Sequence, residues 1–415
     1  MQHQPLVIGL FGFGVVGAAL YRVLQQTPSL DAAIKKVCIR DPHKSRSAPA
    51  DLFTTDGDAL LTDPEINVII ELTNDPQAAY RITESAFRNG KSVISAGKKM
   101  IAENFSRLLA LQQETGQSFL YEAAACASIP VIRNLEEYYD NDLLQGLSGI
   151  VNGSTNYILT KVFEEDLDFD TALLEAQIAG FAETDASLDI EGTDAVHKLS
   201  LLLAHAYGLV EHPLSLIHTG IQNLTTRDAR FAREKGYQIR LVAEARKLDN
   251  GTIAAFVLPR FVRPGEPLYG VRREFNGVVI ESSLADSQFF YGKGAGGFPT
   301  ASAVLSDLSA LRYGYRYEYK KRRQGALPVL ADDYQLQVYV SFGKLFQVPR
   351  EAFGQIDSWS SDEERCHVTG TIPISSLRES NWWKKPGTSL ILLPDAFGGT
   401  AARYGKQPRE ALAAV

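Results

Sequence analysis

The chain has 415 residues, of which 45% are hydrophobic and 22% are charged, as in ordinary soluble globular proteins. Lys and Arg total 42 against 49 Asp and Glu, and the resulting net charge of −7 argues against binding to a nucleic-acid backbone. At roughly 100–200 residues per domain, this length predicts about two to four domains.

The sequence also argues against a membrane protein or a secreted one. No apolar run approaches the ~20 residues that cross a bilayer, and residues 1–10 lack the basic start of a signal peptide. The three cysteines, Cys38, Cys126 and Cys366, are odd in number and far apart, which is typical of a reducing compartment. The histidines show no zinc-binding spacing. We therefore expect a cytoplasmic protein with no membrane partner.

Strands alternate with helices over residues 1–125. The pattern predicts strands at 6–11, 34–39, 67–72, 92–95 and 118–121, with helices at 15–26, 76–89 and 102–114. Strands that alternate with helices of about 10–15 residues indicate βαβ units and a parallel sheet.

The pattern changes after Pro130. Helices are predicted at 153–163, 170–180 and 192–207, strands at 236–248, 252–262, 276–283 and 286–292, and a helix at 299–311 that Pro299 begins. This order predicts an α+β domain. Residues 314–324, which include the basic run KKRR, are interpreted as a strand end and a solvated linker, and the last 90 residues or so as short strands with loops.

A glycine-rich turn follows the first predicted strand and opens the first predicted helix. It consists of Gly12, Phe13, Gly14, Val15, Val16 and Gly17. In such a turn the first glycine permits the tight bend, the second lets the backbone approach a pyrophosphate, and the third allows close packing of helix on strand. The βαβ context favours a dinucleotide site of the Rossmann type over a glycine turn without a ligand.

The end of the second predicted strand bears on which dinucleotide binds. Arg40 stands there, followed by Asp41 and then by Lys44 and Arg46. An arginine at this place accommodates the 2′-phosphate of NADP, whereas an acidic residue binds the free ribose hydroxyl of NAD. The basic residues favour NADP, Asp41 keeps NAD open, and an ordinary solvated turn is the third interpretation.

The segment 180–198, GFAETDASLDIEGTDAVHK, carries several carboxylates before a helix. Asp194 and Lys198 are four residues apart and share one helical face. A surface salt bridge would explain that pair alone, but Glu183, Asp185 and Asp189 crowd the approach to it. Like charges at this density are costly unless a cation lies among them, and the ammonium of a substrate would serve.

Two more segments combine small residues with a helix start. In GIVNGSTNYIL, residues 149–159, Ser154 or Thr155 would serve as a helix cap. In GKGAGGFPTASAVLSDL, residues 292–308, four glycines precede a helix that begins near Pro299. These glycines indicate close approach of the backbone to a ligand, with a flexible hinge as the alternative.

Taken together, these segments resemble the homoserine dehydrogenase family from the first strand to about residue 320. The matching stretches are GLFGFGVVG, SVISAGK, YEAAACASIPVI, GIVNGSTNYIL, GFAETDASLDIEGTDAVHKL and GAGGFPTASAVLSDL. The resemblance implies interconversion of L-homoserine and L-aspartate 4-semialdehyde by hydride transfer with NAD(P), on the pathway to threonine and methionine. It also implies a homodimer that pairs through the second domain.

The resemblance also implies a role for each matching residue. Lys198 and Lys98 are the implied catalytic pair, with Lys198 as proton donor and acceptor at the C4 oxygen of the substrate. The implied substrate-binding residues are Glu183, Asp194 and Ser154. The predicted cofactor contacts are the glycine-rich turn together with Arg40, Thr73, Lys98, Gly294 and Gly296. The implied sodium loop is Glu122 with the carbonyls of Ala125, Ala127 and Ile129.

The resemblance and the sequence pattern together predict the domain organisation. We expect an α/β protein with an N-terminal Rossmann-type parallel sheet over residues 1–128. An α+β catalytic and dimerisation domain is expected over 129–318, whose last helix, 299–312, packs back on the first domain. A small β-rich C-terminal region of unclear role is expected over 319–415.

The chain departs from the family pattern at several positions. Ala127 and Ser128 replace two glycines of the implied sodium loop, where Cys126 also occupies a normally small position. Further departures are Ala186 in place of proline, Phe181 where tyrosine is common, Gly97 in place of asparagine, and Thr73-Asn74 in place of a glycine pair. None of them removes the two lysines or the carboxylates.

The C-terminal region also departs from a pattern common in the family. Many members carry a regulatory ACT domain there, with an Asp-x-Pro-Gly turn after its first strand. Residues 334–340 predict a strand, but Ser341 to Lys344 follow it, so no amino-acid effector site is predicted. Trp359, Trp382 and Trp383 are interpreted as packing residues.

Two other functions are weighed against the dehydrogenase. An aldehyde-oxidising semialdehyde dehydrogenase needs a nucleophilic cysteine, for which Cys126 is the candidate, but its neighbours in sequence offer no cation or histidine to activate it. A catalytically silent NADP-binding regulator would explain the departures, but not the retention of Glu183, Asp194, Lys98 and Lys198.

Overall fold

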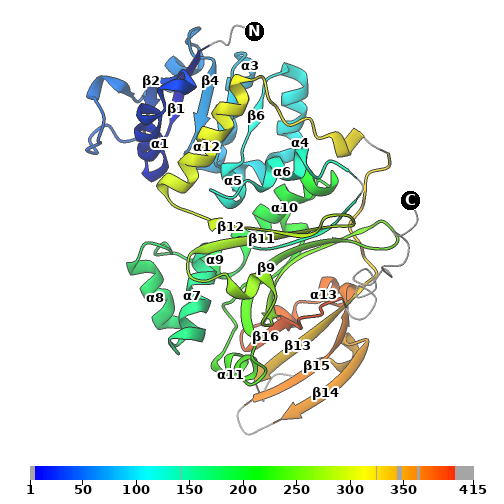
Figure 1. The fold of residues 1–415 in the computed structure, drawn as a ribbon. Helices are drawn as coiled ribbons and strands as arrows, with labels where there is room; N and C mark the ends of the chain where they lie inside the picture. The colour runs from blue at the N-terminus through cyan, green and yellow to red at the C-terminus, as the bar shows by residue number, and fades with distance from the viewer. Residues whose placement is uncertain (1–4, 142, 324, 344–347, 362–364, 398–415) are drawn as a thin grey trace, which may run out of the picture.

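The computed structural model describes residues 5–141, 143–323, 325–343, 348–361 and 365–397. Two β-sheets dominate it, one in the N-terminal part and one in the remainder, with helix α10 (Thr193–Tyr207) between them (Figure 1). None of the helices in these ranges combines the length and the apolar character needed to cross a membrane.

The first sheet has six parallel strands in the order β3-β2-β1-β4-β5-β6. The strands are β1 (Leu6–Phe11), β2 (Ala32–Cys38), β3 (Phe53–Thr54), β4 (Val68–Glu71), β5 (Ser92–Ser95) and β6 (Phe119–Leu120). The order reverses between β1 and β4, and ligands of such sheets bind at the carboxyl ends of the strands beside this reversal. The predicted Rossmann-type sheet is therefore confirmed.

Helices cover this sheet because its central strands are apolar on both faces. Ile8, Leu10, Ile69 and Ile70 are all fully buried. The helices of this part are α1 (Val15–Gln26), α2 (Asp58–Leu61), α3 (Pro76–Arg88), α4 (Lys98–Thr115), α5 (Ala123–Cys126) and α6 (Val131–Glu137). Helix α12 (Gly297–Arg312) returns from the second part of the chain and packs against α1 (Figure 1).

The second sheet is mixed and has ten strands. Its path is β12-β11-β7-β9-β10-β16-β13-β15-β14, with β8 beside β10. The strands that come before residue 300 are β7 (Leu144–Ile150), β8 (Ile217–His218), β9 (Gln238–Lys247), β10 (Ile253–Val262), β11 (Phe275–Ser282) and β12 (Asp286–Lys293). The helices are α7 (Gly153–Glu164), α8 (Phe169–Ile178), α9 (Ser187–Ile190), α10 and α11 (Thr226–Glu234).

Helix α10 is buried along almost its whole length. Every residue from Asp194 to Tyr207 is buried, and the helix contacts α4 and α6 of the first part as well as β9 and β10 of the second sheet. A helix enclosed on all sides needs a partner for each polar group that it carries. This requirement decides the surroundings of Asp194, Lys198 and His205.

The C-terminal strands extend the second sheet rather than forming a separate one. They are β13 (Gln335–Gly343), β14 (Gln355–Ser361), β15 (Arg365–Pro373) and β16 (Thr388–Leu392), with helix α13 (Ile374–Glu379) between the last two. Strand β16 pairs with β10 at Arg260 and Leu392. Trp382 and Trp383 are buried in the core of this region, as their interpretation as packing residues predicts, whereas Trp359 on β14 is exposed. The domain boundary at residue 318 stays a prediction, since the sheet continues across it.

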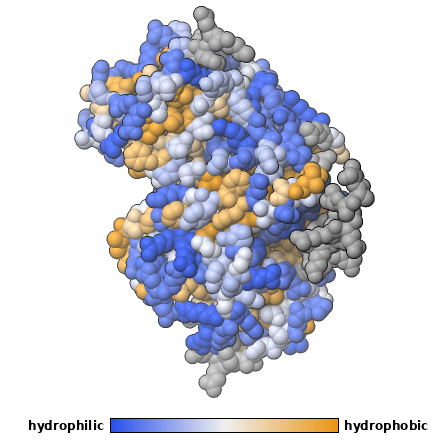
Figure 2. Space-filling model, viewed as in Figure 1, coloured by the Kyte–Doolittle hydropathy of each residue, from blue (hydrophilic) through white to orange (hydrophobic). Residues whose placement is uncertain are grey.

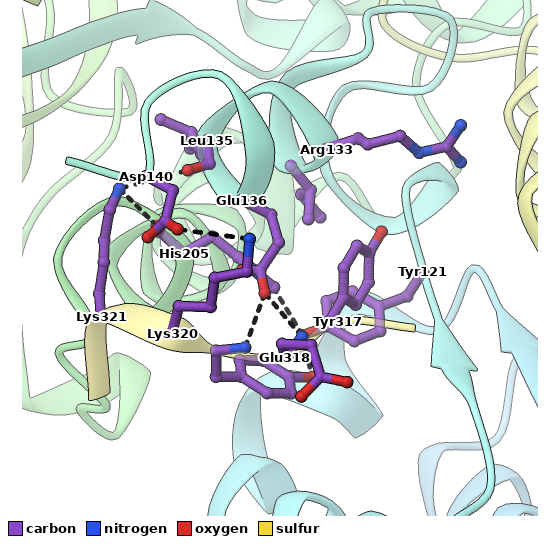
Figure 3. A network of polar contacts seen from close by, with 12 residues as sticks. Tyr121, Arg133, Leu135, Glu136, Asp140, His205, Tyr317, Glu318, Lys320 and Lys321 are labelled. Carbon is purple, nitrogen blue, oxygen red and sulfur yellow. Dashed lines mark hydrogen bonds and ion pairs between the residues drawn. The ribbon is translucent and has the colours of Figure 1, made fainter. Parts of the chain in front are cut away.

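The interpretation of residues 314–324 as a solvated linker is wrong for the lysine and arginine at its centre. Lys321 donates hydrogen bonds to the carbonyls of Leu135 and His205, at 3.2 and 3.1 Å, and Arg322 donates to the carbonyl of Gly208. These bonds satisfy carbonyls at the C-terminal ends of α6 and α10, which have no partner inside their own helices. The basic run therefore caps the C-terminal ends of two buried helices (Figure 3).

A buried polar network lies beside these hydrogen bonds. The Glu136 carboxylate accepts hydrogen bonds from the backbone N–H groups of Glu318 and Tyr319, and it contacts Nδ1 of His205 at 2.8 Å. The Nε2 atom of His205 in turn lies 2.7 Å from the hydroxyl of Tyr121 (Figure 3). The network joins β6, α6 and α10 to the segment that leads into the C-terminal strands.

Replacing Lys321 by Met tests this role. We expect the substitution to lower the free energy of unfolding by about 1–3 kcal/mol, because two buried carbonyls lose their donor. The matched control is Lys320→Met, since the Lys320 side chain is exposed and makes one ion pair, with Asp140 at 3.4 Å. That change is expected to cost less than about 1 kcal/mol. Equal effects of the two substitutions in urea denaturation would contradict the assignment.

Candidate active site

The glycine-rich turn has the geometry of a phosphate cradle. Gly12 has a φ of +94°, and a Cβ atom there would lie 2.6 Å from the carbonyl oxygen of Leu72. A Cβ on Gly17 would lie 2.5 Å from the carbonyl oxygen of Gly12, whereas the space beside Gly14 is open. Two glycines are thus required for packing, and the third leaves the backbone accessible at the start of α1. These residues fit a dinucleotide.

The second glycine segment, which ends at Gly297, packs against the start of α1 beside the glycine-rich turn. Gly297, the first residue of α12, is so near α1 that a Cβ atom there would lie 3.0 Å from both the Cγ1 atom and the carbonyl oxygen of Val15. Gly294 and Gly296 directly precede it. Figure 2 shows the surface indented between the N-terminal part and the part below it, with hydrophobic residues on both sides. Val15 and Phe298 are exposed, as expected for residues beside a cofactor cleft.

Basic residues gather beyond the end of β2. A cavity of about 440 Å³ is lined by nine residues, among them Lys44, Arg46 and Phe53. The Arg46 guanidinium donates to the carbonyls of Lys44 and Asp41, which fixes the turn. Arg40 is exposed, and its charge helps to lower the pKa of Asp75, after the backbone N–H of Ala78. The structure therefore brings Arg40 to the strand end where a ribose phosphate would lie.

Thr73 is positioned by a carboxylate that the sequence analysis did not single out. Glu71 is fully buried at the end of β4, and one of its oxygens accepts hydrogen bonds from the N–H and the hydroxyl of Thr73. Its other oxygen accepts from Ser95 at 2.6 Å. Burial raises the pKa of Glu71. The signal in the sequence was a glutamate at the end of an otherwise apolar strand.

Two lysines share one buried carboxylate where the two parts of the chain meet. Lys98 begins α4, and its Nζ lies 2.8 Å from Oδ1 of Asp194. Lys198, one turn along α10, has its Nζ 2.9 Å from Oδ2 of Asp194 and donates to the carbonyl of Val151 at 2.6 Å. Burial opposes ionisation of Asp194, but the two ammonium groups outweigh it and hold its pKa well below the usual range. Asp194 in turn raises the pKa of Lys98.

The two lysines differ in their access to solvent. The Lys98 side chain is 42% exposed, whereas that of Lys198 is 8% exposed. Lys198 therefore lies at the inner end of the site and Lys98 at its opening. An ammonium has three N–H donors, and within the described part of the chain Asp194 and Val151 take up two of those of Lys198.

Asn152 is a further site residue that sequence reasoning missed. Its Nδ2 donates to Asp189 at 2.7 Å and to Asp194 at 2.8 Å, while its Oδ1 caps α7 by accepting from the N–H of Thr155. Asn152 thus holds two carboxylates of the acidic segment next to each other. Burial, followed by the charge of Asp194, raises the pKa of Asp189. The residue stood inside the stretch GIVNGSTNYIL, but its partners come from a distant segment.

The other predicted substrate residues lie around this centre, and the Ser154 hydroxyl interacts with Asp189, whose pKa it lowers against the effect of burial. Ser154 donates its hydroxyl hydrogen to the carbonyl of Phe181 at 2.6 Å. Glu183 is exposed, and its charge helps to raise the pKa of Lys98. Asp185 is exposed and accepts from the N–H of Ser187. The structure thus brings together Lys98, Lys198, Asp194 and Asp189, and it leaves Glu183 at the rim.

Glu122 of the predicted sodium loop also serves the start of a helix. Both carboxylate oxygens of Glu122 accept backbone N–H bonds at the start of α6, from Ile132 and Arg133 at 2.9 and 2.8 Å. In the described ranges no three His, Cys, Asp or Glu side chains converge as they would around a metal ion. Ala127 has a φ of +45° and a ψ of −105°, a conformation that favours glycine. Each carboxylate oxygen of Glu122 keeps a further lone pair, and backbone carbonyls complete the predicted loop, so this loop stays a prediction.

Comparison with known proteins gives one consistent family. The model described as "Homoserine dehydrogenase, NAD binding domain" matches residues 12–122, and that described as "Homoserine dehydrogenase" matches residues 130–309. The homoserine dehydrogenase of Bacillus subtilis is 32% identical over 369 residues, covering 83% of this chain and 85% of that one. That of Synechocystis is 34% identical over 311 residues, covering 72% of each.

Solved structures give the same result. A homoserine dehydrogenase from Thiobacillus denitrificans has a TM-score of 0.83 at 28% identity, covering 94% of this chain and 98% of its own. A hyperthermophilic archaeal homoserine dehydrogenase mutant in complex with NADPH has a TM-score of 0.65 at 26% identity, covering 76% of this chain and 100% of its own.

Proposed function

Because the chain belongs to the homoserine dehydrogenase family, we propose that Lys98, Lys198 and Asp194 perform the chemistry of that family's reaction in this chain. The family consists of NAD(P)-dependent oxidoreductases that interconvert L-homoserine and L-aspartate 4-semialdehyde. The observation that carries the proposal is the single buried carboxylate held between two lysine ammonium groups, one on α4 and one on α10.

In the reducing direction, negative charge develops on the C4 oxygen of the semialdehyde. The cofactor, when bound, supplies the hydride. The third N–H of the Lys198 ammonium stabilises the developing charge and donates the proton, which leaves a neutral amine. In the oxidising direction the neutral amine of Lys198 takes the proton of the homoserine hydroxyl. The carbonyl of Val151 and the carboxylate of Asp194 fix the direction in which that N–H points.

Lys98 contributes a second positive charge at the opening of the site. Its ammonium is anchored to Asp194, and its side chain stays partly exposed to solvent. The shared carboxylate keeps two lysines close together that would otherwise repel each other. We assign Lys98 to orienting the substrate and to stabilising negative charge on it.

The acidic segment provides the site for the substrate ammonium. Asp189 is partly buried beside Asp194, and the resulting rise in its pKa marks a place where an added cation would be stabilised. Glu183 at the rim supplies a further carboxylate, and Ser154 helps to shape this wall through its bond to Phe181. These residues together suit an α-amino acid.

The structure offers less support for the two alternative functions. Cys126 would have to be the nucleophile of a semialdehyde dehydrogenase, but burial raises its pKa to about 12. The thiolate that such chemistry needs is therefore disfavoured. A silent NADP-binding regulator would have no use for two lysines that converge on one carboxylate.

For the cofactor we propose NADP rather than NAD. Arg40 precedes the turn that carries Lys44 and Arg46, and the three side chains offer positive charge where the 2′-phosphate would lie. A related archaeal homoserine dehydrogenase mutant is known in complex with NADPH. The Asp41 carboxylate accepts a hydrogen bond from the N–H of His43 within its own turn, so it is less suited to bind a ribose hydroxyl.

Three further predictions concern the oligomeric state, the location and the sodium loop. A homodimer that pairs through the second domain is supported by the apolar side chains exposed on the edge strand β12, Phe289 and Tyr291. A cytoplasmic location is supported by the free cysteines Cys38, Cys126 and Cys366. Sodium binding at Glu122 stays a prediction, and no step of the reaction is routed through it; the same carboxylate accepts two N–H groups at the start of α6.

Lysine substitutions test the catalytic assignment. With L-homoserine and NADP, Lys198→Ala and Lys98→Ala are each expected to lower kcat/KM by about 100-fold or more, since each removes charge and hydrogen bonding at the reacting oxygen. Lys99→Ala is the matched control, because Lys99 is adjacent but exposed and lies 4.0 Å from Glu103. Absence of turnover in the unmodified protein would refute the activity, whereas near-normal turnover of Lys198→Ala would refute only the role of that lysine.

The cofactor assignment has a separate test. Arg40→Ala is expected to reduce the ratio of kcat/KM for NADP to that for NAD by about 10-fold, as loss of a charged contact predicts. Arg81→Ala is the control, because Arg81 is also exposed and also acts on Asp75. An unchanged ratio in Arg40→Ala would show that Arg40 does not read the 2′-phosphate.

A further inference from the structure

One side chain in the wall of the site remains unexplained by the mechanism above. Asn276, at the start of β11, is fully buried, and neither its Nδ2 nor its Oδ1 has a hydrogen-bond partner among the described residues. It interacts with the buried thiol of Cys126, but a thiol is only a weak hydrogen-bonding group. A buried amide without partners is costly, and native proteins retain such groups chiefly where they have a use.

Asn276 lies between the lysine centre and the glycine segment of the cofactor cleft. Its neighbour Gly277 pairs with Ile150 of β7, and Val151, the next residue along, accepts the hydrogen bond of Lys198. On the other side, Asn276 pairs with Gly292 of β12, two residues before Gly294. Cys126 interacts both with Asn276 and with the charge of Lys198, so the carboxamide lies between the lysine centre and the glycine segment.

The glycine at 294 is required by this carboxamide. A Cβ atom on Gly294 would lie 1.9 Å from Nδ2 of Asn276 and 2.1 Å from its Cγ, so the backbone of the segment rests directly on the amide. Gly294 is buried, while Ala295 and Gly296 are exposed, and Gly296 has a φ of +114°. The segment that covers Asn276 is thus the one that flanks the cofactor cleft.

The backbone that carries Asn276 is held firmly. The Nδ2 atom of Asn156, on α7, donates to the carbonyls of Arg273 and Phe275 at 2.9 and 3.1 Å, and to that of Val271 at 3.3 Å. A side chain fixed on a strand in this way suits a binding role that demands accurate placement.

We propose that Asn276 binds the carboxamide group of the nicotinamide ring. A carboxamide is complementary to a second carboxamide: Nδ2 donates to the carbonyl oxygen of the cofactor amide, and Oδ1 accepts from its NH₂ group. This contact would require the backbone of Gly294, which covers the amide, to shift. The inference rests on the proposed function, whose cofactor it orients for transfer of hydride to the carbon beside Lys198.

The test uses Asn276→Leu, which keeps the approximate shape of the side chain and removes both polar atoms. Binding of NADPH is measured by fluorescence titration, beside binding of 2′-phospho-ADP-ribose, which lacks the nicotinamide ring. We expect affinity for NADPH to fall about 3- to 10-fold, the value of one ordinary hydrogen bond or slightly more, and affinity for the ring-free ligand to stay within twofold. The thermal midpoint of the free protein is expected to be unchanged or raised, because an unpartnered buried amide is lost.

Thr83→Val is the matched control, since the Thr83 hydroxyl is also fully buried without a partner but lies on α3. It is expected to leave both affinities unchanged. The inference is overturned if Asn276→Leu binds NADPH as tightly as the unmodified protein does, or if it loses affinity equally for the ring-free ligand.

A second measurement needs no variant of the site and covers the case in which Asn276→Leu fails to fold. The 3-acetylpyridine analogue of NADPH has a methyl group in place of the amide NH₂, so the unmodified protein is expected to bind it about 3-fold or more weakly than NADPH. Equal affinity for the two overturns the inference. If the unmodified protein binds NADPH but does not turn over L-homoserine, the proposed function fails on its own, and the binding comparison still decides the role of Asn276.

Discussion

The buried carboxylate of Asp194 is the constraint on which the rest of the site depends. It is 6% exposed, and it is the point where the first part of the chain, through Lys98, meets the second, through Lys198. Burying an ion pair is costly unless each charge is also hydrogen-bonded. That condition is met here, because Asn152 donates to Asp194 and the carbonyl of Val151 accepts from Lys198.

The placement of this carboxylate in turn requires α10 to be held along its length. The helix carries Asp194 and Lys198 near its start and His205 near its end, all of them buried. The end is fixed by the Lys321 ammonium on its carbonyls and by the contact of His205 with Glu136 (Figure 3). The segment that follows α12 is thereby linked to the helix that carries Asp194 and Lys198. Strand β16, which pairs with β10, joins the C-terminal strands to the same sheet.

The sequence predicted those features that local patterns encode. The glycine-rich turn, the parallel sheet and the spacing of Asp194 and Lys198 were recognisable because each depends on neighbours within one element or one turn. Asn152, Glu71 and Asn276 were missed, since their roles come from partners in distant segments or from the lack of any partner. Strand β7 and helix α11 were missed as well. The glycines and serine of β7 weaken its strand pattern, and helix α11 carries several charged residues.

Two departures from the family pattern can be followed in the structure. Ala127 adopts a conformation in which glycine is the usual residue, and the hydroxyl of its neighbour Ser128 donates to the carbonyl of Lys293, just before the glycine segment. Ser341, which stands after the predicted C-terminal strand where an effector-binding turn would begin, is buried within β13 and donates to Asp228. That position therefore serves the junction between β13 and α11.

The most direct test of this account is the turnover of L-homoserine by Asp194→Asn. Asparagine keeps the shape of the side chain but removes the charge that holds two ammonium groups together. We predict a loss in kcat/KM on the order of 100-fold with NADPH affinity retained, whereas Asp185→Asn, a change in the exposed part of the same acidic segment, has little effect. Turnover by Asp194→Asn within a few-fold of the unmodified protein would contradict the central role of this carboxylate.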